Sequence, residues 1–163
     1  MNGKGLYSGL DLRTRKMLLG SFRVFFRHMP VRYHTFAYAT RQFASLDKLA
    51  GTMRRGIVNF LFDNLAELQT YDAVKVYYDN GQHSIAESLH LAIGYALSKD
   101  AVVDRSAQPS EYRVSQAADY ICTMELAAIK YAEHAVTATD EKFFGKWSDF
   151  KKGILKETRK KLV

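Results

Sequence analysis

Segments whose apolar residues recur at helical spacing alternate along this sequence with short segments typical of strands. This alternation restricts the fold more than any other feature. Apolar side chains recur at helical spacing over residues 10–28, and Pro30 ends that predicted helix. The segment Val31–Thr40 is dense in Tyr, Phe, Thr and Val and alternates in polarity, which predicts a strand. A long helix is then predicted from about Ser45 to Tyr71, with Ser45 as its N-cap.

The second half continues the same alternation. Ala73–Asp79 is a short apolar run that is typical of a strand buried on both faces, and Asn80-Gly81 turns the chain after it. A capping-box pattern opens a helix at Ser84, residues 101–103 predict a short strand, and a further helix is predicted over about 115–136. This order indicates an α/β fold with right-handed crossovers and a mostly parallel sheet.

Length, apolar runs and cysteine content limit the classes of protein to which this chain can belong. The length of 163 residues is that of one ordinary domain, so we predict a single domain over 1–163 that ends in a basic tail, 151–163. No apolar run approaches the roughly 18 residues that cross a bilayer, and we expect no membrane partner. Cys122 is the only cysteine and is predicted to be a small core residue. These features predict a cytoplasmic protein.

The charge is divided along the chain. Residues 1–60 hold 11 Lys and Arg against two acids, residues 61–150 hold seven against 14, and residues 151–163 hold six against one. Basic ends around an acidic middle suit a protein that holds a polyanion beside a metal-binding centre, and nucleic acid is the expected partner. The alternative is that these charges serve solubility alone.

Two carboxylates are the candidate catalytic and metal-binding residues. Asp79 ends the most strand-like segment, and α/β sheets bind ligands beyond the carboxyl ends of their strands. A carboxylate at that place can bind Mg²⁺ or Mn²⁺. The alternative is that Asp79 only forms part of a turn. Asp119 lies in a helix that Ile121 and Met124 predict to be closely packed. A buried carboxylate needs a partner, either a metal ion or an ordinary hydrogen-bond donor. Gln116 lies one turn before Asp119 on the same face.

Three stretches carry a resemblance to a known family. They are Val76-Tyr77-Tyr78-Asp79-Asn80-Gly81-Gln82, the run Tyr112-Arg113-Val114-Ser115-Gln116-Ala117-Ala118-Asp119-Tyr120-Ile121-Cys122, and Phe143-Phe144-Gly145 before the Lys-rich end. Together with Lys4-Gly5-Leu6-Tyr7-Ser8, they resemble the domain of unknown function numbered 3800. The resemblance covers essentially the whole chain, which matches about the C-terminal two-thirds of that domain.

The resemblance implies a ribonuclease-H-like fold, a mixed sheet flanked by helices, and a metal-dependent nuclease. In such folds, carboxylates gather around one or two Mg²⁺ ions that clamp the attacking and leaving oxygens of a phosphodiester. Asp79 matches the acid of a middle strand and Asp119 that of the last helix. Asn80, Gln82 and Gln116 match positions that orient substrate or ligands.

One departure from the family limits this expectation. The family opens with a strand that carries Asp-Glu-Ser-Gly and supplies the first acid, and this motif is absent here. We therefore expect an N-terminally truncated sheet whose edges, at Val31–Thr40 and Ala73–Asp79, are covered by a second copy of the chain or by a separate N-terminal fragment. We expect catalysis by the isolated chain to be impaired or absent.

Three functions follow from these patterns. The first is a metal-dependent nuclease that uses Asp79 and Asp119. The second is a non-catalytic nucleic-acid-binding or regulatory module, and the third is a truncated product without function. In the first two, phosphates are expected to contact the tail and the basic side chains of the first helix, which are Arg13, Arg15, Lys16, Arg23 and Arg27.

Overall fold

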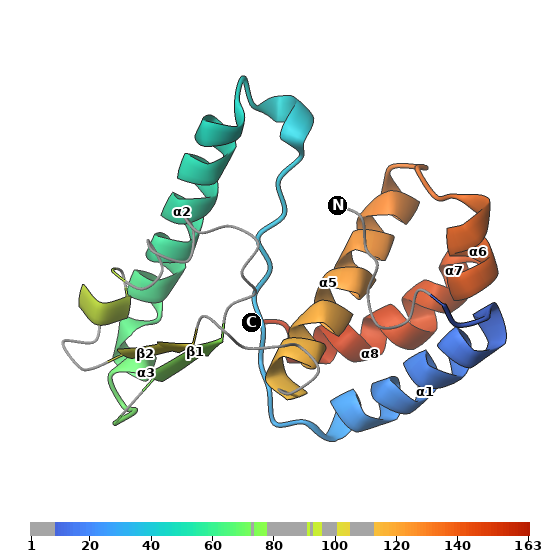
Figure 1. The fold of residues 1–163 in the computed structure, drawn as a ribbon, viewed down its shortest axis with the longest axis horizontal. Helices are drawn as coiled ribbons and strands as arrows, with labels where there is room; N and C mark the ends of the chain where they lie inside the picture. Colours follow the sequence, from blue (N-terminus) through green and yellow to red (C-terminus); the bar gives the residue numbers. More distant parts are fainter. Residues whose placement is uncertain (1–8, 73, 78–90, 92, 96–100, 105–112) are drawn as a thin grey trace. The chain divides into compact units, whose positions relative to one another are not determined.

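The computed structural model describes residues 9–72, 74–77, 91, 93–95, 101–104 and 113–163 (Figure 1). Helices dominate this part of the chain. The larger elements are α1 (Leu12–His28), α2 (Leu46–Asp63), β1 (Val74–Tyr77), β2 (Ala101–Asp104), α5 (Arg113–Ala132) and α6 (Ala138–Phe144). The shorter ones are η1 (Thr40–Gln42), α3 (Leu65–Leu68), α7 (Trp147–Phe150), η2 (Lys151–Leu155), α8 (Lys156–Thr158) and η3 (Arg159–Lys161).

The chain forms two compact units. Unit 1 consists of Met1–His34 and Ala117–Val163, and unit 2 consists of Thr35–Gln116. Residues 147–161 run from α7 through η2 and α8 to η3 and are called here the C-terminal helical segment. Unit 1 is therefore built from the two ends of the sequence, and unit 2 from its middle.

Helix α1 confirms the first predicted helix. Its N-cap is Asp11, whose carboxylate accepts a 2.8 Å hydrogen bond from the backbone N–H of Thr14. The helix ends at Met29, which is extended because a residue before proline avoids the helical conformation. Phe26 is buried on the inner side of the helix, and Leu19 and Phe22 pack beside it.

Helix α5 supplies most of the core of unit 1. Tyr120, Ile121 and Met124 are buried at helical spacing, and Met124 is fully buried. Phe150 and Leu155 of the C-terminal helical segment and Phe26 of α1 close this core from two other sides, and these helices lie side by side in Figure 1. Burial of this apolar surface is the main source of stability for unit 1.

Unit 2 holds the long helix and the two strands. Ser45 caps α2 as predicted, since its hydroxyl accepts a hydrogen bond from the backbone N–H of Lys48. The predicted helix is interrupted at Asn64, whose side chain donates a 2.8 Å hydrogen bond to the carbonyl of Phe60 and competes with the regular helical pattern. Strands β1 and β2 pair in parallel, with Val74 opposite Ala101.

The predicted ribonuclease-H-like α/β fold is wrong. Within the described residues, β1 and β2 form only a two-stranded sheet, and there is no mixed sheet flanked by helices. Val31–Thr40 is not a strand: only Tyr33 pairs there, in a single bridge to Leu162. Tyr33 packs instead into the helical core, which offers an aromatic side chain the apolar surface that a sheet would otherwise provide.

The absence of a strand at Val31–Thr40 removes one reason for expecting a partner chain. The predicted sheet edge at Val31–Thr40 does not exist, so it needs no second copy or N-terminal fragment to cover it. The helix predicted after Ser84 falls largely outside the described residues. Among the described helices, none combines the length and apolarity needed to cross a bilayer.

Candidate nucleic-acid interface

The two basic ends of the sequence meet in unit 1. Unit 1 contains 16 Lys and Arg residues against eight Asp and Glu, a formal charge of +8, whereas unit 2 contains eight against nine. Tyr33 joins the ends through its backbone: its N–H donates to the carbonyl of Lys161, and its carbonyl accepts from the N–H of Val163. The positive charge of the protein is therefore concentrated in one unit.

Four cationic side chains lie along one side of α1. Arg13, Lys16, Arg23 and Arg27 are separated by three, seven and four residues, spacings that return to the same side of a helix. Helix α1 contains no acidic residue to neutralise them. Arg13, Lys16 and Arg27 are exposed, whereas Arg15 lies half-buried on another side of the helix.

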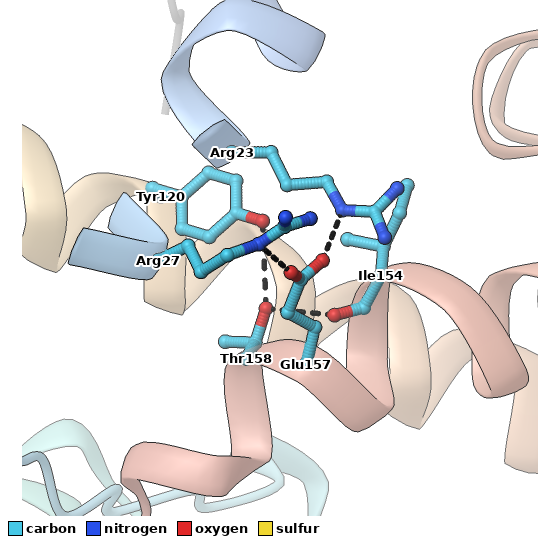
Figure 2. Close-up of polar contacts among 6 residues, drawn as sticks. All are labelled: Arg23, Arg27, Tyr120, Ile154, Glu157 and Thr158. Atoms are coloured by element: carbon cyan, nitrogen blue, oxygen red, sulfur yellow. Dashed lines mark hydrogen bonds and ion pairs between the residues drawn. The ribbon is translucent and has the colours of Figure 1, made fainter. Parts of the chain in front are cut away.

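Glu157 holds the last two of these arginines. Its carboxylate accepts hydrogen bonds from Nε of Arg23 and from Nε of Arg27, one on each oxygen (Figure 2). The carboxylate is largely buried, with 16% of its side chain exposed, whereas 52% of Arg27 is exposed. Burial alone would raise the pKa of Glu157, but the hydrogen bonds from the two guanidinium groups outweigh burial and hold this pKa below its ordinary value.

Packing next to Glu157 fixes the carboxylate in place. Thr158 is buried, and its hydroxyl donates a 2.9 Å hydrogen bond to the carbonyl of Ile154. The same hydroxyl lies 3.4 Å from the hydroxyl of the buried Tyr120 on α5 (Figure 2). The residue that follows Glu157 is thus anchored in the core, next to the acid that binds Arg23 and Arg27.

A second charged group lies in the same unit. Glu125 of α5 binds the guanidinium of Arg159 through contacts of 2.6–3.2 Å and accepts a 2.8 Å hydrogen bond from the hydroxyl of Tyr33. Burial would raise the pKa of Glu125, but the hydrogen bonds from Arg159 and Tyr33 lower it overall. Glu125 therefore engages two nitrogens of the Arg159 guanidinium, Nε and Nη2.

An open hollow lies between the end of α1 and the C-terminal helical segment. Its volume is about 380 Å³, and Arg27, Glu157, Lys160 and Lys161 line it. The ammonium of Lys161 donates a 2.6 Å hydrogen bond to the carbonyl of Met29. Lys160 is exposed. Three cations thus surround one carboxylate that is already satisfied, which leaves the hollow with a net positive charge.

Further exposed lysines lie along the C-terminal helical segment. Lys151 lies over the ring of Trp147 at 5.6 Å, and Lys152 and Lys156 are exposed as well. Residues 151–161 of the predicted basic tail are therefore helical, and Leu155 among them is buried in the core, whereas Leu162 and Val163 at the end are exposed.

Half of the predicted carboxylate site lies outside the described residues. Asp79, Asn80 and Gln82 belong to this part of the chain, and their predicted roles stay predictions. Asp119 is described, and it is exposed on α5. The reasoning that a buried Asp119 requires a cation does not apply, because Ile121 and Met124 face the core from another side of the helix.

Gln116 is the other residue of the predicted carboxylate site that the structure describes. Gln116 accepts a 2.9 Å hydrogen bond from Arg113 in the first turn of α5. Within the described residues, no three His, Cys, Asp or Glu side chains come close enough to hold a metal ion. Cys122 is exposed rather than in the core, so that prediction is wrong; the neighbouring core positions are filled by Ile121 and Met124.

Comparisons with protein-family models, with curated proteins and with solved structures found no match to this chain. The resemblance to the domain of unknown function numbered 3800 therefore stays a prediction, as does the nuclease activity that it implies. The candidate interface depends only on the residues and contacts described above.

Sequence reasoning missed the role of Glu157. The basic end was recognised as a contact surface, but its single acid was counted only as a charge. One signal was present: Glu157 is the only acidic residue among residues 151–163, and an acid retained among six cations indicates a specific pairing. Its partners, Arg23 and Arg27, are 134 and 130 residues away, and no local pattern identifies them.

Proposed function

We propose that this chain is a non-catalytic nucleic-acid-binding module that contacts the phosphate backbone through the basic surface of unit 1. The observation that carries the proposal is the convergence of the basic side of α1 and the lysines of the C-terminal helical segment on one unit with a formal charge of +8. Lys and Arg side chains that neutralise phosphates release counterions, and this release drives binding without regard to sequence.

The dimensions of α1 suit a nucleic acid. The helix rises about 1.5 Å per residue, so Arg13 and Arg27 are about 21 Å apart along its axis. This distance corresponds to about six steps of a strand at roughly 3.4 Å per nucleotide. A repeating anion can therefore meet several of these side chains at once, which a single small anion cannot do.

The proposal is tested by the salt dependence of binding. Labelled single- and double-stranded DNA and RNA are titrated with the protein at several salt concentrations, and the slope of log K against log[salt] is measured. Lys156→Gln/Lys160→Gln should weaken binding of every sequence and make the slope shallower by about two. Lys48→Gln/Arg54→Gln is the matched control, because it removes the same charge from exposed positions of α2 in unit 2.

Two results would contradict the proposal. Equal losses in the two variants would mean that net charge alone, and not the surface of unit 1, governs binding. Cleavage of the same oligonucleotides with Mg²⁺ or Mn²⁺ that disappears in Asp79→Asn or Asp119→Asn would establish the metal-dependent nuclease instead. No described contact favours cleavage, so we expect the oligonucleotides to stay intact.

A further inference from the structure

Two cationic side chains of α1, Arg23 and Arg27, are bound to the same acid. One largely buried carboxylate, that of Glu157, accepts a hydrogen bond from each. In a surface that serves only to attract a polyanion, such an acid is a disadvantage, because it cancels positive charge at that position. Its presence requires another reason.

The orientation of Arg27 supplies that reason. An arginine side chain loses considerable rotamer freedom when it binds a ligand, and this loss opposes binding. Glu157 engages Arg27 through Nε, while Arg27 remains about half exposed and lines the hollow. The guanidinium has five N–H donors, so a bond at Nε leaves others available to a second acceptor. Glu157 thus orders Arg27 before any ligand arrives.

The hollow suits a phosphate group in charge and is large enough to admit one. Its other cations are Lys160, which is exposed, and Lys161, which is held by the carbonyl of Met29. A volume of about 380 Å³ exceeds the roughly 30 Å³ of one water molecule by far, which leaves room for a phosphate together with its sugar. Arginine recognises phosphate through paired N–H donors, and lysine adds a point charge.

We infer that this hollow is a seat for one backbone phosphate of a bound nucleic acid, held by Arg27 and Lys160, with Glu157 as the positioning residue that orders Arg27. The inference rests on the proposed function for the identity of its occupant. It adds a specific prediction about sign, because removing the negative charge of Glu157 should weaken the binding of a polyanion.

The direction of this effect on binding is tested with two charge-matched variants. Binding of a labelled single-stranded oligonucleotide is measured by fluorescence anisotropy for the wild type, Glu157→Gln and Glu141→Gln. Both variants lose one negative charge, and Glu141 is an exposed residue of α6. We expect Glu157→Gln to bind several-fold more weakly and Glu141→Gln to bind as tightly as the wild type or slightly more tightly. Circular dichroism verifies that each variant is folded.

A second pair of variants keeps the test decisive if Glu157→Gln does not fold. Arg27→Lys preserves the charge and leaves Glu157 paired with Arg23, whereas Arg13→Lys makes the same change at an exposed position elsewhere on α1. A several-fold loss is expected for Arg27→Lys alone. Oligonucleotide binding that is unaffected by both Glu157→Gln and Arg27→Lys would overturn the seat and leave the proposed function standing.

A titration with inorganic phosphate distinguishes failure of the phosphate site from failure of the proposed function. The Nε–H signal of Arg27 is followed by NMR while sodium phosphate is added, with sodium chloride at equal ionic strength as the control. If no oligonucleotide binds but phosphate shifts this signal in the wild type and not in Glu157→Gln, the proposed function fails and the hollow is a site for free phosphate. If neither ligand binds, both the seat and the proposed function are overturned.

Discussion

The hydroxyl of Tyr33 donates a 2.8 Å hydrogen bond to the carboxylate of Glu125, which also binds Arg159. Tyr33 is only 8% exposed, so its replacement by Phe leaves the packing intact and removes one donor from a charged acceptor. Tyr33→Phe should lower the free energy of unfolding by about 1–2 kcal/mol, measured by urea denaturation. Tyr71→Phe, at a half-exposed position, should change it by less than about 0.5 kcal/mol. A loss of equal size in both variants would contradict the role of Glu125.

Acid should destabilise unit 1 in part through two of its paired carboxylates, those of Glu125 and Glu157. Burial raises the pKa values of Glu125 and Glu157, but the hydrogen bonds from their partners lower both overall below the ordinary value near 4.5. Each group binds its proton more readily in the unfolded chain, so its contribution is complete above about pH 4.5 and is lost as the pH falls through the lower, folded pKa.

The measurement is urea unfolding from pH 7 down to pH 3. The wild type should lose stability below about pH 4.5. Glu125→Gln/Glu157→Gln should be less stable at pH 7 and should lose less on acidification. If the double variant falls as steeply as the wild type, other groups are responsible for acid unfolding.

Met124 should be a critical residue of the core of unit 1. It is 0% exposed and lies among buried side chains of α1, α5 and the C-terminal helical segment. Met124→Ala should lower the free energy of unfolding by about 2–5 kcal/mol, because it removes apolar contacts and leaves a cavity. Leu126→Ala, two residues along the same helix at a side chain 55% exposed, should cost less than about 1 kcal/mol. Similar losses would place the core elsewhere.

The two glycines of α2 should respond differently to alanine. A Cβ at Gly51 would have its nearest neighbour at 3.9 Å, so Gly51→Ala should stabilise the helix by about 1 kcal/mol. A Cβ at Gly56 would overlap the hydroxyl of Tyr38, so Gly56→Ala should gain less or become destabilising. Thermal unfolding of Gly56→Ala, Tyr38→Phe and the double variant should show that Tyr38→Phe restores the gain. Additive effects would mean that the hydroxyl is not the obstacle.

Helices were the predictable part of this fold. Apolar spacing and caps such as Ser45 are local, so α1, most of α2 and α5 followed from the sequence, as did β1 and β2 as strands. Val31–Thr40 was misassigned because a tyrosine-rich extended segment has the same pattern whether it pairs with a strand or, as at Tyr33, packs on helices. That error supported the wrong fold class.

The candidate interface was predictable only as composition. The charges of the two ends are visible in the sequence, and they indicated a polyanion partner. Which cations are engaged and which are available depends on Glu125 and Glu157, whose partners lie 34 or more residues away. Such pairing arises from tertiary structure, and one sequence carries no periodic signal for it.

The division of unit 1 between the two ends of the sequence has a consequence for its synthesis. Helix α1 leaves the ribosome before unit 2 is made, but Phe26 and Tyr33 cannot be covered until α5 and the C-terminal helical segment have followed. The core of unit 1 therefore closes only after the C-terminal helical segment has been translated. During that interval, the apolar side of α1 is exposed to chaperones and to other nascent chains, and the time taken to translate residues 35–155 sets the minimum duration of this exposure.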